Sequence, residues 1–231
     1  MTIDLNCDLG EGAGFDAEII PLITSANVSC GAHAGTAEDI MRTLALCKQH
    51  GVTVGAHPGH ADREHFGRRE LPVTAQEIVA LLRGQIGALR RWAQAAGVAV
   101  RYVKPHGGLY HQANRDAPAA GAMLAVGGEL GLPVVGLPGS RLQALAGHDG
   151  GVITEGFADR RYQADGSLVP RDQPNAMIDD PNEAVAQVLW LLDRGAVQTV
   201  CVHGDNPRAV EFVRAVREEL IRRGVELKPF A

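Results

Sequence analysis

The stretch MTIDLNCDLGEG, residues 1–12, alternates apolar and polar side chains and then ends in a turn of glycine and glutamate. Such alternation predicts a β-strand, because successive side chains of a strand point to opposite faces. Asp4, Asn6 and Asp8 then share one face, while the apolar residues between them meet helices on the other. Polar groups on an interior face are destabilising unless they are satisfied. The stretch therefore predicts either a buried polar network that positions the next loop, with Asp8 and Glu11 at the turn, or the start of a reactive site.

Six further β-rich runs follow, separated by longer segments with helical periodicity. The predicted strands lie near Thr2–Asn6, Ala26–Cys30, Val52–Ala56, Val98–Lys104, Pro133–Gly136, Gly151–Glu155 and Gln198–His203. Capping residues at Thr36, Thr74 and Asp180, and the Asn206-Pro207 pair, mark the expected starts of four helices. Strands that alternate with helices indicate βα units around a parallel sheet.

Chemically reactive side chains follow nearly every predicted strand. They are Asp8, His33, His57, His106, Glu155 and His203. An open doubly wound sheet binds ligands mainly at one crevice, whereas a barrel collects the carboxyl ends of all its strands around one mouth. We therefore expect an α/β fold, a TIM-like (β/α) barrel of seven strands, formed as a single domain by residues 1–231.

The composition argues against several classes of protein. The formal net charge is -5 and the arginines are scattered, so a nucleic-acid-binding surface is not expected. No apolar run approaches the roughly 20 residues that span a bilayer, and the N-terminus has no signal-peptide pattern. The four cysteines form no C-x-x-C pair and are expected to be reduced thiols. These features predict a cytoplasmic protein with no membrane partner.

Two histidines stand in matching glycine-rich loops after neighbouring strands. His33 lies in SCGAHAG and His57 in GAHPG, and glycine permits the close approach of a ligand. Each histidine alone is usually a surface or hydrogen-bonded residue, but the matching positions predict a shared site. Together with His106 and Asp8 they can form a divalent-metal site. That possibility depends on barrel geometry, because no pair has the spacing of ligands on a helix.

Lys104 and His106 flank Pro105, which favours an extended backbone and directs both side chains to the same side. A lysine inside a barrel needs an anionic partner. The sequence leaves two interpretations open. One is a structural ion pair with Asp4 or Asp8, and the other is a cation that stabilises charge on a substrate carbonyl or phosphoryl group.

Paired arginines follow the sixth predicted strand, in the segment EGFADRRY, residues 155–162. The guanidinium fork of Arg160 or Arg161 matches a carboxylate or phosphate, although a solvated loop with one local ion pair also fits. Residues 159–180 have little periodicity, which is typical of either a binding loop over a barrel mouth or a surface excursion.

The last strand ends in HGDNP, where Asp205 either orients His203 as an acid–base pair or simply precedes the helix cap.

The sequence contains no G-x-S-x-G elbow, P-loop, dinucleotide fingerprint or H-E-x-x-H motif. Serine-triad hydrolysis and nucleotide binding by a Walker loop are therefore not expected.

Seven segments together resemble the LamB/YcsF family, in that family's order from one terminus to the other. They are DLNCDLGEG (4–12), CGAHAG (30–35), GAHPG (55–59), FGRR (66–69), KPHG (104–107), EGFADRRY (155–162) and VHGDNP (202–207). One departure is visible. His60-Ala61-Asp62 stands where the family pattern leads us to expect an aromatic residue and a proline.

The resemblance implies a seven-stranded barrel related to those of polysaccharide deacetylases. It also implies a hydrolase acting on a cyclic amide, as the A subunit of an ATP-dependent 5-oxoprolinase that works with B and C subunits. Such an enzyme opens 5-oxoproline to L-glutamate, with ATP as co-substrate and Mg²⁺ accompanying the ATP. Neither the subunit that binds ATP nor the existence of a homo-oligomer follows from the sequence.

Catalytic roles follow as hypotheses. Asp8 or Glu155 is expected to activate water as a general base. Lys104, with His106 or His57, is expected to stabilise the charge that develops on the substrate.

Binding roles are assigned in the same way. Arg160 or Arg161 is expected to hold the substrate carboxylate. The other expected substrate-binding residues are Glu11, His33, His57, His203 and Asp205. Two rival functions remain: a stand-alone metal-dependent amide hydrolase or deacetylase, and a non-catalytic subunit that only binds 5-oxoproline or holds its partners together.

Overall fold

The main strands of the protein form one closed parallel ring. The computed structural model describes residues 1–147, 151–171 and 173–231. Strand β1 pairs with β2 on one side and with β7 on the other, and the pairing runs in order from β2 to β7. The ring strands are β1 (Thr2–Leu9), β2 (Ser25–Ser29), β3 (Thr53–His57), β4 (Val100–Val103), β5 (Val134–Gly136), β6 (Val152–Phe157) and β7 (Thr199–His203). The predicted seven-stranded (β/α) barrel is confirmed, and each ring strand overlaps a predicted one.

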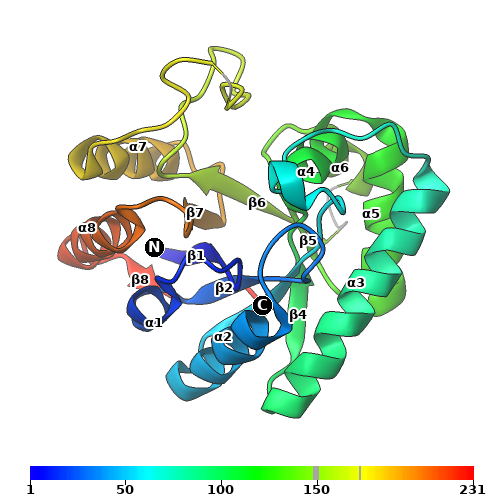
Figure 1. The fold of residues 1–231 in the computed structure, drawn as a ribbon. Coiled ribbons are helices and arrows are strands. Elements are labelled where there is room, and N and C mark those ends of the chain that lie inside the picture. Colours follow the sequence, from blue (N-terminus) through cyan, green and yellow to red (C-terminus); the bar gives the residue numbers. More distant parts are fainter. Residues whose placement is uncertain (148–150, 172) are drawn as a thin grey trace.

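Helices surround the ring. They are α1 (Asp16–Ile19), α2 (Ala37–His50), α3 (Ala75–Ala96), α4 (Gly107–Arg115), α5 (Ala117–Leu130), α6 (Arg141–Ala146), α7 (Pro181–Asp193) and α8 (Ala209–Arg222), with short 3₁₀ helices η1 (Ile20–Leu22) and η2 (Arg63–His65). Figure 1 shows them outside the strands, and α3 packs against both α2 and α5. Within the described part of the chain, no helix combines the length and the apolar character needed to cross a membrane.

The predicted caps begin three of these helices. Thr36 and Thr74 each accept the N–H of the residue three positions on, and an acidic side chain at that position returns to the cap. Asp180 accepts the N–H of Asn182 at the start of α7. Local side-chain chemistry therefore determines where these helices start.

One helix start and one short strand differ from the prediction. The last helix begins at Ala209 and not at the Asn206-Pro207 pair, because Asn206 Oδ1 accepts the N–H of Arg208 and holds a turn there. Strand β8 (Glu226–Leu227) pairs with the beginning of β1 outside the ring. The two residues of β8 are too few to show a strand period in the sequence, so this strand was not predicted.

Apolar side chains fill the layer between strands and helices. Ile3 and Leu5 of β1 lie in this layer, as predicted, together with Leu44 of α2, Leu82 of α3 and Phe212 of α8. The apolar face of β1 therefore points outward to the helices, and its polar face is left for the interior of the barrel.

The interior of the barrel is filled largely by polar side chains. Asp4 accepts hydrogen bonds from the hydroxyl groups of Thr24, Ser25 and Thr199. Asn6 lies two residues further along β1, on the same face of the strand. Its Nδ2 donates a hydrogen bond to Thr199 Oγ1 over 2.6 Å. Asp4 and Asn6 thus both find partners on or beside neighbouring strands, and the buried network predicted for β1 is confirmed.

Lys104 lies at the centre of this interior network. Its Nζ is 2.9 Å from Asp8 Oδ1 and 2.8 Å from Glu155 Oε1, and it also contacts Asn6 Oδ1 and Cys201 Sγ. An ammonium has three N–H donors, so these acceptors saturate it. Burial would lower the pKa of Lys104, but the charge of Asp8 raises it well above its usual value. The structural ion pair with Asp8 is therefore present.

Gly55 makes room for an aromatic ring inside the barrel. A Cβ at this position would lie 2.1 Å from the ring of Tyr102. We expect Gly55→Ala to lower the free energy of unfolding by about 1–3 kcal/mol, as overpacking does, measured by urea denaturation. Gly84→Ala in α3 is the control, because open space surrounds Gly84 and alanine should raise helix stability by about 0.5–1 kcal/mol. Equal stability of Gly55→Ala and wild type would contradict the packing.

Removal of the Lys104 charge is predicted to destabilise the protein. Lys104→Met leaves two carboxylates buried without their cation, which typically costs about 3–5 kcal/mol. Combining it with Glu155→Gln should recover part of the loss, since one buried charge is then gone. Lys48→Met on the exposed side of α2 is the matched control. A urea-unfolding loss no larger than that of the control would refute the central role of the ammonium.

Candidate active site

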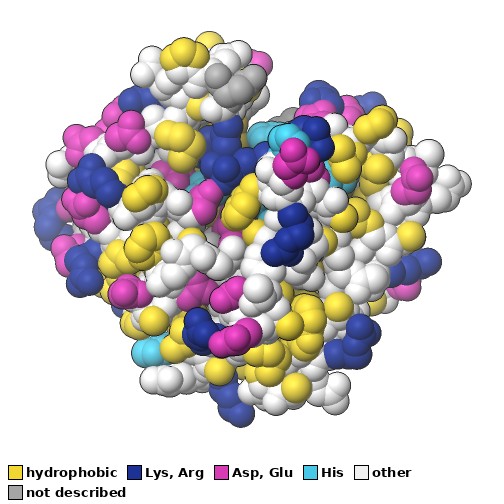
Figure 2. Space-filling model, in the orientation of Figure 1, with side chains coloured by type: hydrophobic (Ala, Val, Ile, Leu, Met, Phe, Trp, Pro, Cys, Tyr) yellow, Lys and Arg dark blue, Asp and Glu magenta, His cyan; other side chains and the backbone are white. Residues whose placement is uncertain are grey.

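A cleft of about 900 Å³ opens at the carboxyl ends of the barrel strands. Its floor includes the strand-end residues Asp8, His57, Lys104, His106 and His203, which the structure brings together as a barrel mouth should. Another wall comes from the irregular segment after β6, which therefore borders the cleft as a binding loop would. Figure 2 shows this hollow, with lysine or arginine side chains in dark blue and histidine in cyan gathered in it.

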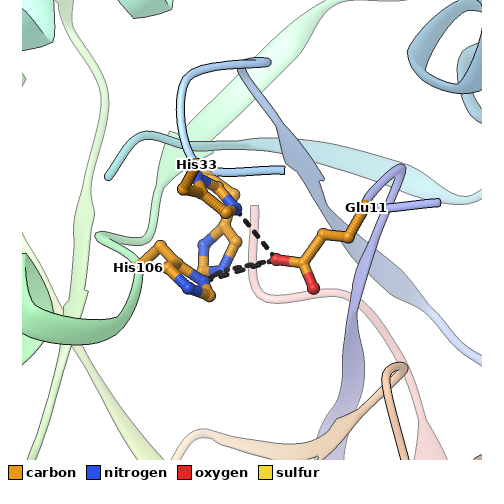
Figure 3. Close-up of side chains that lie close together, drawn as sticks. Glu11, His33 and His106 are labelled. Atoms are coloured by element: carbon orange, nitrogen blue, oxygen red, sulfur yellow. Dashed lines mark hydrogen bonds and ion pairs between the residues drawn. The ribbon is translucent and has the colours of Figure 1, made fainter. Parts of the chain in front are cut away.

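Glu11, His33, His57 and His106 form a buried group beside the cleft, here named the Glu11 cluster. Glu11 Oε1 lies 3.0 Å from His33 Nε2, 3.3 Å from His106 Nδ1 and 3.8 Å from His57 Nε2. The His33 and His106 rings stack with their centroids 3.9 Å apart. In Figure 3 these two rings face the same carboxylate oxygen of Glu11. The loop after β2, the end of β3 and the start of α4 thus each bring a histidine to one acid, which follows β1.

Backbone carbonyls fix the tautomers of two of these histidines. His57 Nδ1 lies 2.7 Å from the Lys104 carbonyl oxygen, and His106 Nε2 lies 2.8 Å from that of Phe66. Because a carbonyl oxygen only accepts, both of these nitrogens must carry hydrogen. The neutral rings then keep lone pairs on His57 Nε2 and His106 Nδ1, which are 2.9 Å apart. Two lone pairs at this distance repel each other unless a proton or a metal cation is shared by the cluster.

The electrostatics of the cluster favour His57 over His33 and His106 as the place of an additional proton. Burial lowers the pKa of His33. Burial and the charges of His33 and His57 place the pKa of His106 well below its usual value. Burial would lower the pKa of His57 too, but the charges of Asp8 and Glu11 raise it. The proton on His57 Nε2 can be donated to His106 Nδ1, which removes the repulsion between the rings.

The donor set of the Glu11 cluster also fits a divalent cation. One ligand atom from each of the four residues lies within 4.8 Å of the others, and imidazole with carboxylate is a common donor set for zinc and related metals. His33 Nδ1 has no hydrogen-bond partner among the described residues. Asp8, which the sequence grouped with these histidines, approaches the cluster at His57, with Oδ2 3.4 Å from Nε2. Glu11 takes the place that sequence reasoning gave to Asp8.

An acid–histidine pair faces the cluster from the last strand of the barrel. Asp159 accepts hydrogen bonds from the backbone N–H of His203 and from its Nδ1, at 3.1 and 2.9 Å. His203 Nε2 is left as an acceptor, 4.0 Å from Asp8 Oδ2. Burial would raise the pKa of Asp159, but its interactions with His203 lower it.

The expectation that Asp205 orients His203 is wrong, because Asp205 pairs with Arg68 and Asp159 takes that role. The order of the strands in the barrel is a signal that points to Asp159. Strand β6 neighbours β7 in the barrel, so residues just beyond β6 reach the end of β7.

The two adjacent arginines after β6 point in different directions. Arg160 is buried, lines the cleft and donates from Nη2 to the Val169 carbonyl oxygen over 2.7 Å. Burial lowers its pKa to about 10. Arg161 pairs instead with Glu183 on α7, away from the cleft lining. Only the first of the two is therefore placed to meet a ligand.

Glu155, one of two candidate general bases, is fully buried in the barrel interior. Its carboxylate contacts Lys104 and Asn6, and it does not belong to the residues that line the cleft. The ammonium of Lys104 separates it from Asp8.

The four cysteines are free and buried, as expected.

Full-length relatives and a solved structure of similar sequence resemble this chain. The A subunit of 5-oxoprolinase from Neisseria meningitidis serogroup B is 42% identical over 240 residues, covering 97% of this chain and 98% of its own. A crystal structure of the lactam utilization protein from Thermus thermophilus is 41% identical, with a TM-score of 0.90 and full coverage of both chains.

More distant structures share only the fold. A family 4 carbohydrate esterase from Streptomyces lividans has 12% identity and a TM-score of 0.56, over 100% of this chain and 93% of that one. The expected likeness to deacetylase barrels is thus confirmed.

The sequence profile of the LamB/YcsF family matches residues 3–231. The chain belongs to the LamB/YcsF family.

Proposed function

We propose that this chain is the A subunit of a 5-oxoprolinase, which opens the lactam ring of 5-oxoproline to L-glutamate in a reaction coupled to ATP hydrolysis. The observation that carries the proposal is the relation at 42% identity, over nearly the full length of both chains, to proteins named as the A subunit of 5-oxoprolinase. That name implies further subunits, and we assign B and C subunits as partners in the cytoplasm. The absence of a P-loop motif from the sequence favours a contribution of those partners to ATP use.

A five-membered lactam resists hydrolysis because its amide is stabilised by resonance. Opening it needs three things: activation of the carbonyl group, a base that takes a proton from water, and a site that holds the substrate. Transfer of the terminal phosphoryl group from ATP to the amide oxygen, with release of ADP, supplies the activation, because the ring carbon then becomes electrophilic. Water adds to that carbon, the C–N bond breaks, and the nitrogen takes the proton as it leaves, which gives an acyl phosphate. Hydrolysis of the acyl phosphate by a second water releases inorganic phosphate and L-glutamate. The barrel mouth contains groups suited to the other two tasks.

We assign the general base to His203, with Asp159 as its positioning residue. The hydrogen bond from Nδ1 to Asp159 leaves the lone pair of Nε2 directed to the cleft, 4.0 Å from Asp8 Oδ2. A water molecule that contacts both atoms can pass its proton to Nε2. Asp8 is a weaker base: burial would raise its pKa, but the charges of His57 and Lys104 hold it well below its usual value. We therefore assign Asp8 to binding and orienting that water.

Lys104 acts in this scheme through Asp8. Its donors are engaged by Asp8, Glu155 and their neighbours, so we assign it to holding the Asp8 carboxylate at the floor of the cleft. Arg160, buried in the cleft wall, is assigned to the substrate carboxylate, since a guanidinium recognises that group with two parallel hydrogen bonds.

We also propose that the Glu11 cluster holds a divalent cation. Glu11, His33, His57 and His106 would supply its ligands, and one ligand atom from each of the four lies within 4.8 Å of the others, which supports this assignment. When bound, such a cation polarises a carbonyl group or lowers the pKa of water. The same cluster favours one rival function, a metal-dependent amide hydrolase that needs neither ATP nor partners.

Glutamate release tests the function. This chain, its B and C partners, and the mixture are incubated with 5-oxoproline and ATP. We expect turnover only in the mixture. His203→Gln should lower kcat by about 10²–10⁴-fold, as loss of a general base does, with little change in KM, while His50→Gln at the exposed end of α2 should leave turnover unchanged.

Three outcomes would contradict this assignment. Glutamate formation by the partners without this chain would remove it from the reaction. Full turnover with both His203→Gln and Asp8→Asn, in a complex that still assembles, would make it a non-catalytic component. Hydrolysis of the amide by this chain alone, lost on addition of a chelator, would establish the rival hydrolase.

Metal binding is tested separately from activity. We expect the purified chain to bind one equivalent of Zn²⁺ in calorimetric titration. Glu11→Gln and His33→Ala should each weaken binding by more than about 100-fold, since loss of residues that only support metal ligands already costs 10–100-fold. His65→Ala is the matched control, because this histidine is partly exposed and pairs with Asp62. Equal affinity of the His33 and His65 variants would exclude the cluster as the binding site.

A further inference from the structure

Five arginines line the cleft, and they differ in their partners. Arg69 and Arg115 each form a two-pronged pair with a nearby carboxylate. Arg68, Arg160 and Arg171 line the cleft without such a pair among the described residues. The cleft therefore holds guanidinium groups in excess of the acids that neutralise them.

Arg68 and Arg171 both approach one carboxylate oxygen. Arg68 Nη2 donates to Asp205 Oδ2, and Arg171 Nη1 lies 4.0 Å from the same atom. The side chains of the two arginines are 36% and 25% exposed. Among the described residues, this 4.0 Å contact with Asp205 is the shortest polar contact of the Arg171 guanidinium. Two cations thus share one acid in a partly desolvated wall.

This arrangement is electrostatically unfavourable until an anion enters. Burial, followed by repulsion from Arg68, lowers the pKa of Arg171. The face of the Arg68 guanidinium lies 4.8 Å from the centre of the Phe66 ring, which limits the directions in which its N–H groups can point. An incoming anion relieves the repulsion between the two guanidinium groups and accepts N–H donors that protein atoms leave free.

We propose that Arg68 and Arg171 bind a phosphate group of the ligand, with Asp205 as the anion that the phosphate replaces or joins. The proposal rests on the proposed function in one respect, namely that Arg160 is already taken by the substrate carboxylate. The ligand then carries two anionic groups. A lactam phosphorylated on its carbonyl oxygen has this character, and so does 5-oxoproline bound beside the terminal phosphate of a nucleotide.

Phosphate suits this pair better than a second carboxylate does. Asp205 already offers a carboxylate, but a single one of its oxygens faces both arginines, and this oxygen accepts a hydrogen bond from Arg68 and lies 4.0 Å from Arg171 Nη1. A phosphate presents three terminal oxygens and close to two negative charges at neutral pH, so that each guanidinium can bind with its own pair of N–H groups.

Calorimetric titration of the purified chain with inorganic phosphate, at constant ionic strength, tests the site. We expect one phosphate per chain. Arg68→Gln and Arg171→Gln should each weaken binding by about tenfold or more, the effect of losing a hydrogen bond between charged groups. Asp205→Asn should tighten binding several-fold, because the competing carboxylate is removed. Arg161→Gln is the matched control: it removes the same charge outside the cleft and should have no effect.

A second readout comes from His111, which lines the same cleft. Burial and the charges of Arg160 and Arg171 lower its pKa to about 4. A phosphate bound beside Arg171 should therefore raise the pKa of the His111 ring, followed by NMR with and without phosphate. Failure of wild type to bind phosphate, or equal affinities of the Arg171, Asp205 and Arg161 variants, would overturn the proposal.

The outcomes for the site and for the function can be separated. Phosphate binding uses this chain alone, whereas glutamate release uses the complex with its partners. Normal glutamate release with no phosphate binding would remove the phosphate site and leave the function intact. Phosphate binding without glutamate release from the complex would do the reverse. Competition between ADP and phosphate would identify a nucleotide as the source of the phosphate, and binding of phosphate but not ADP would identify a phosphorylated substrate.

Discussion

The buried ammonium of Lys104 is the constraint on which the rest of the site depends. Its Nζ lies between two buried carboxylates, 2.9 Å from Asp8 Oδ1 and 2.8 Å from Glu155 Oε1. Without this cation, both carboxylates would lose their ion pair. Because it holds Oδ1 of Asp8, the second oxygen of that carboxylate faces His57 and His203. The carbonyl oxygen of the same lysine accepts from His57 Nδ1. One residue of the loop after β4 thereby orients groups from β1 and β3.

The cleft has two chemically different sides. The Glu11 cluster offers lone pairs from an acid and three imidazoles, which suit a cation or a shared proton. The wall built by Arg68, Arg160 and Arg171 offers N–H donors and positive charge. His203, held by its hydrogen bond to Asp159, lines the same cleft. A ligand with an activated carbonyl group and attached anions matches this division, because its reacting carbon then lies near the base and its charges lie near the arginines.

Much of the fold could be predicted from the sequence because its signals are local. Alternation in β1 and the capping boxes at Thr36 and Thr74 need only a few neighbouring residues. The site was harder, since strand ends reveal which residues meet but not which partners they choose. Asp159 and Asp205 are both near His203 in the fold, and only the packing of β6 against β7 selects Asp159. The opposite directions of adjacent arginines likewise depend on tertiary contacts that no local pattern records.

Because the interior is polar, the residues that stabilise this barrel also position the groups of its candidate active site. A barrel filled by branched aliphatic side chains can be repacked without touching its mouth. Here the interior layers are linked upward, from Asp4 through Thr199 and Asn6 to Glu155 and Lys104. A change low in the barrel leaves a polar group unsatisfied and shifts the layer above it. The apolar shell between strands and helices supplies the hydrophobic stabilisation, while the interior supplies orientation. Substitutions within this column are therefore expected to alter folding and the geometry of the site together.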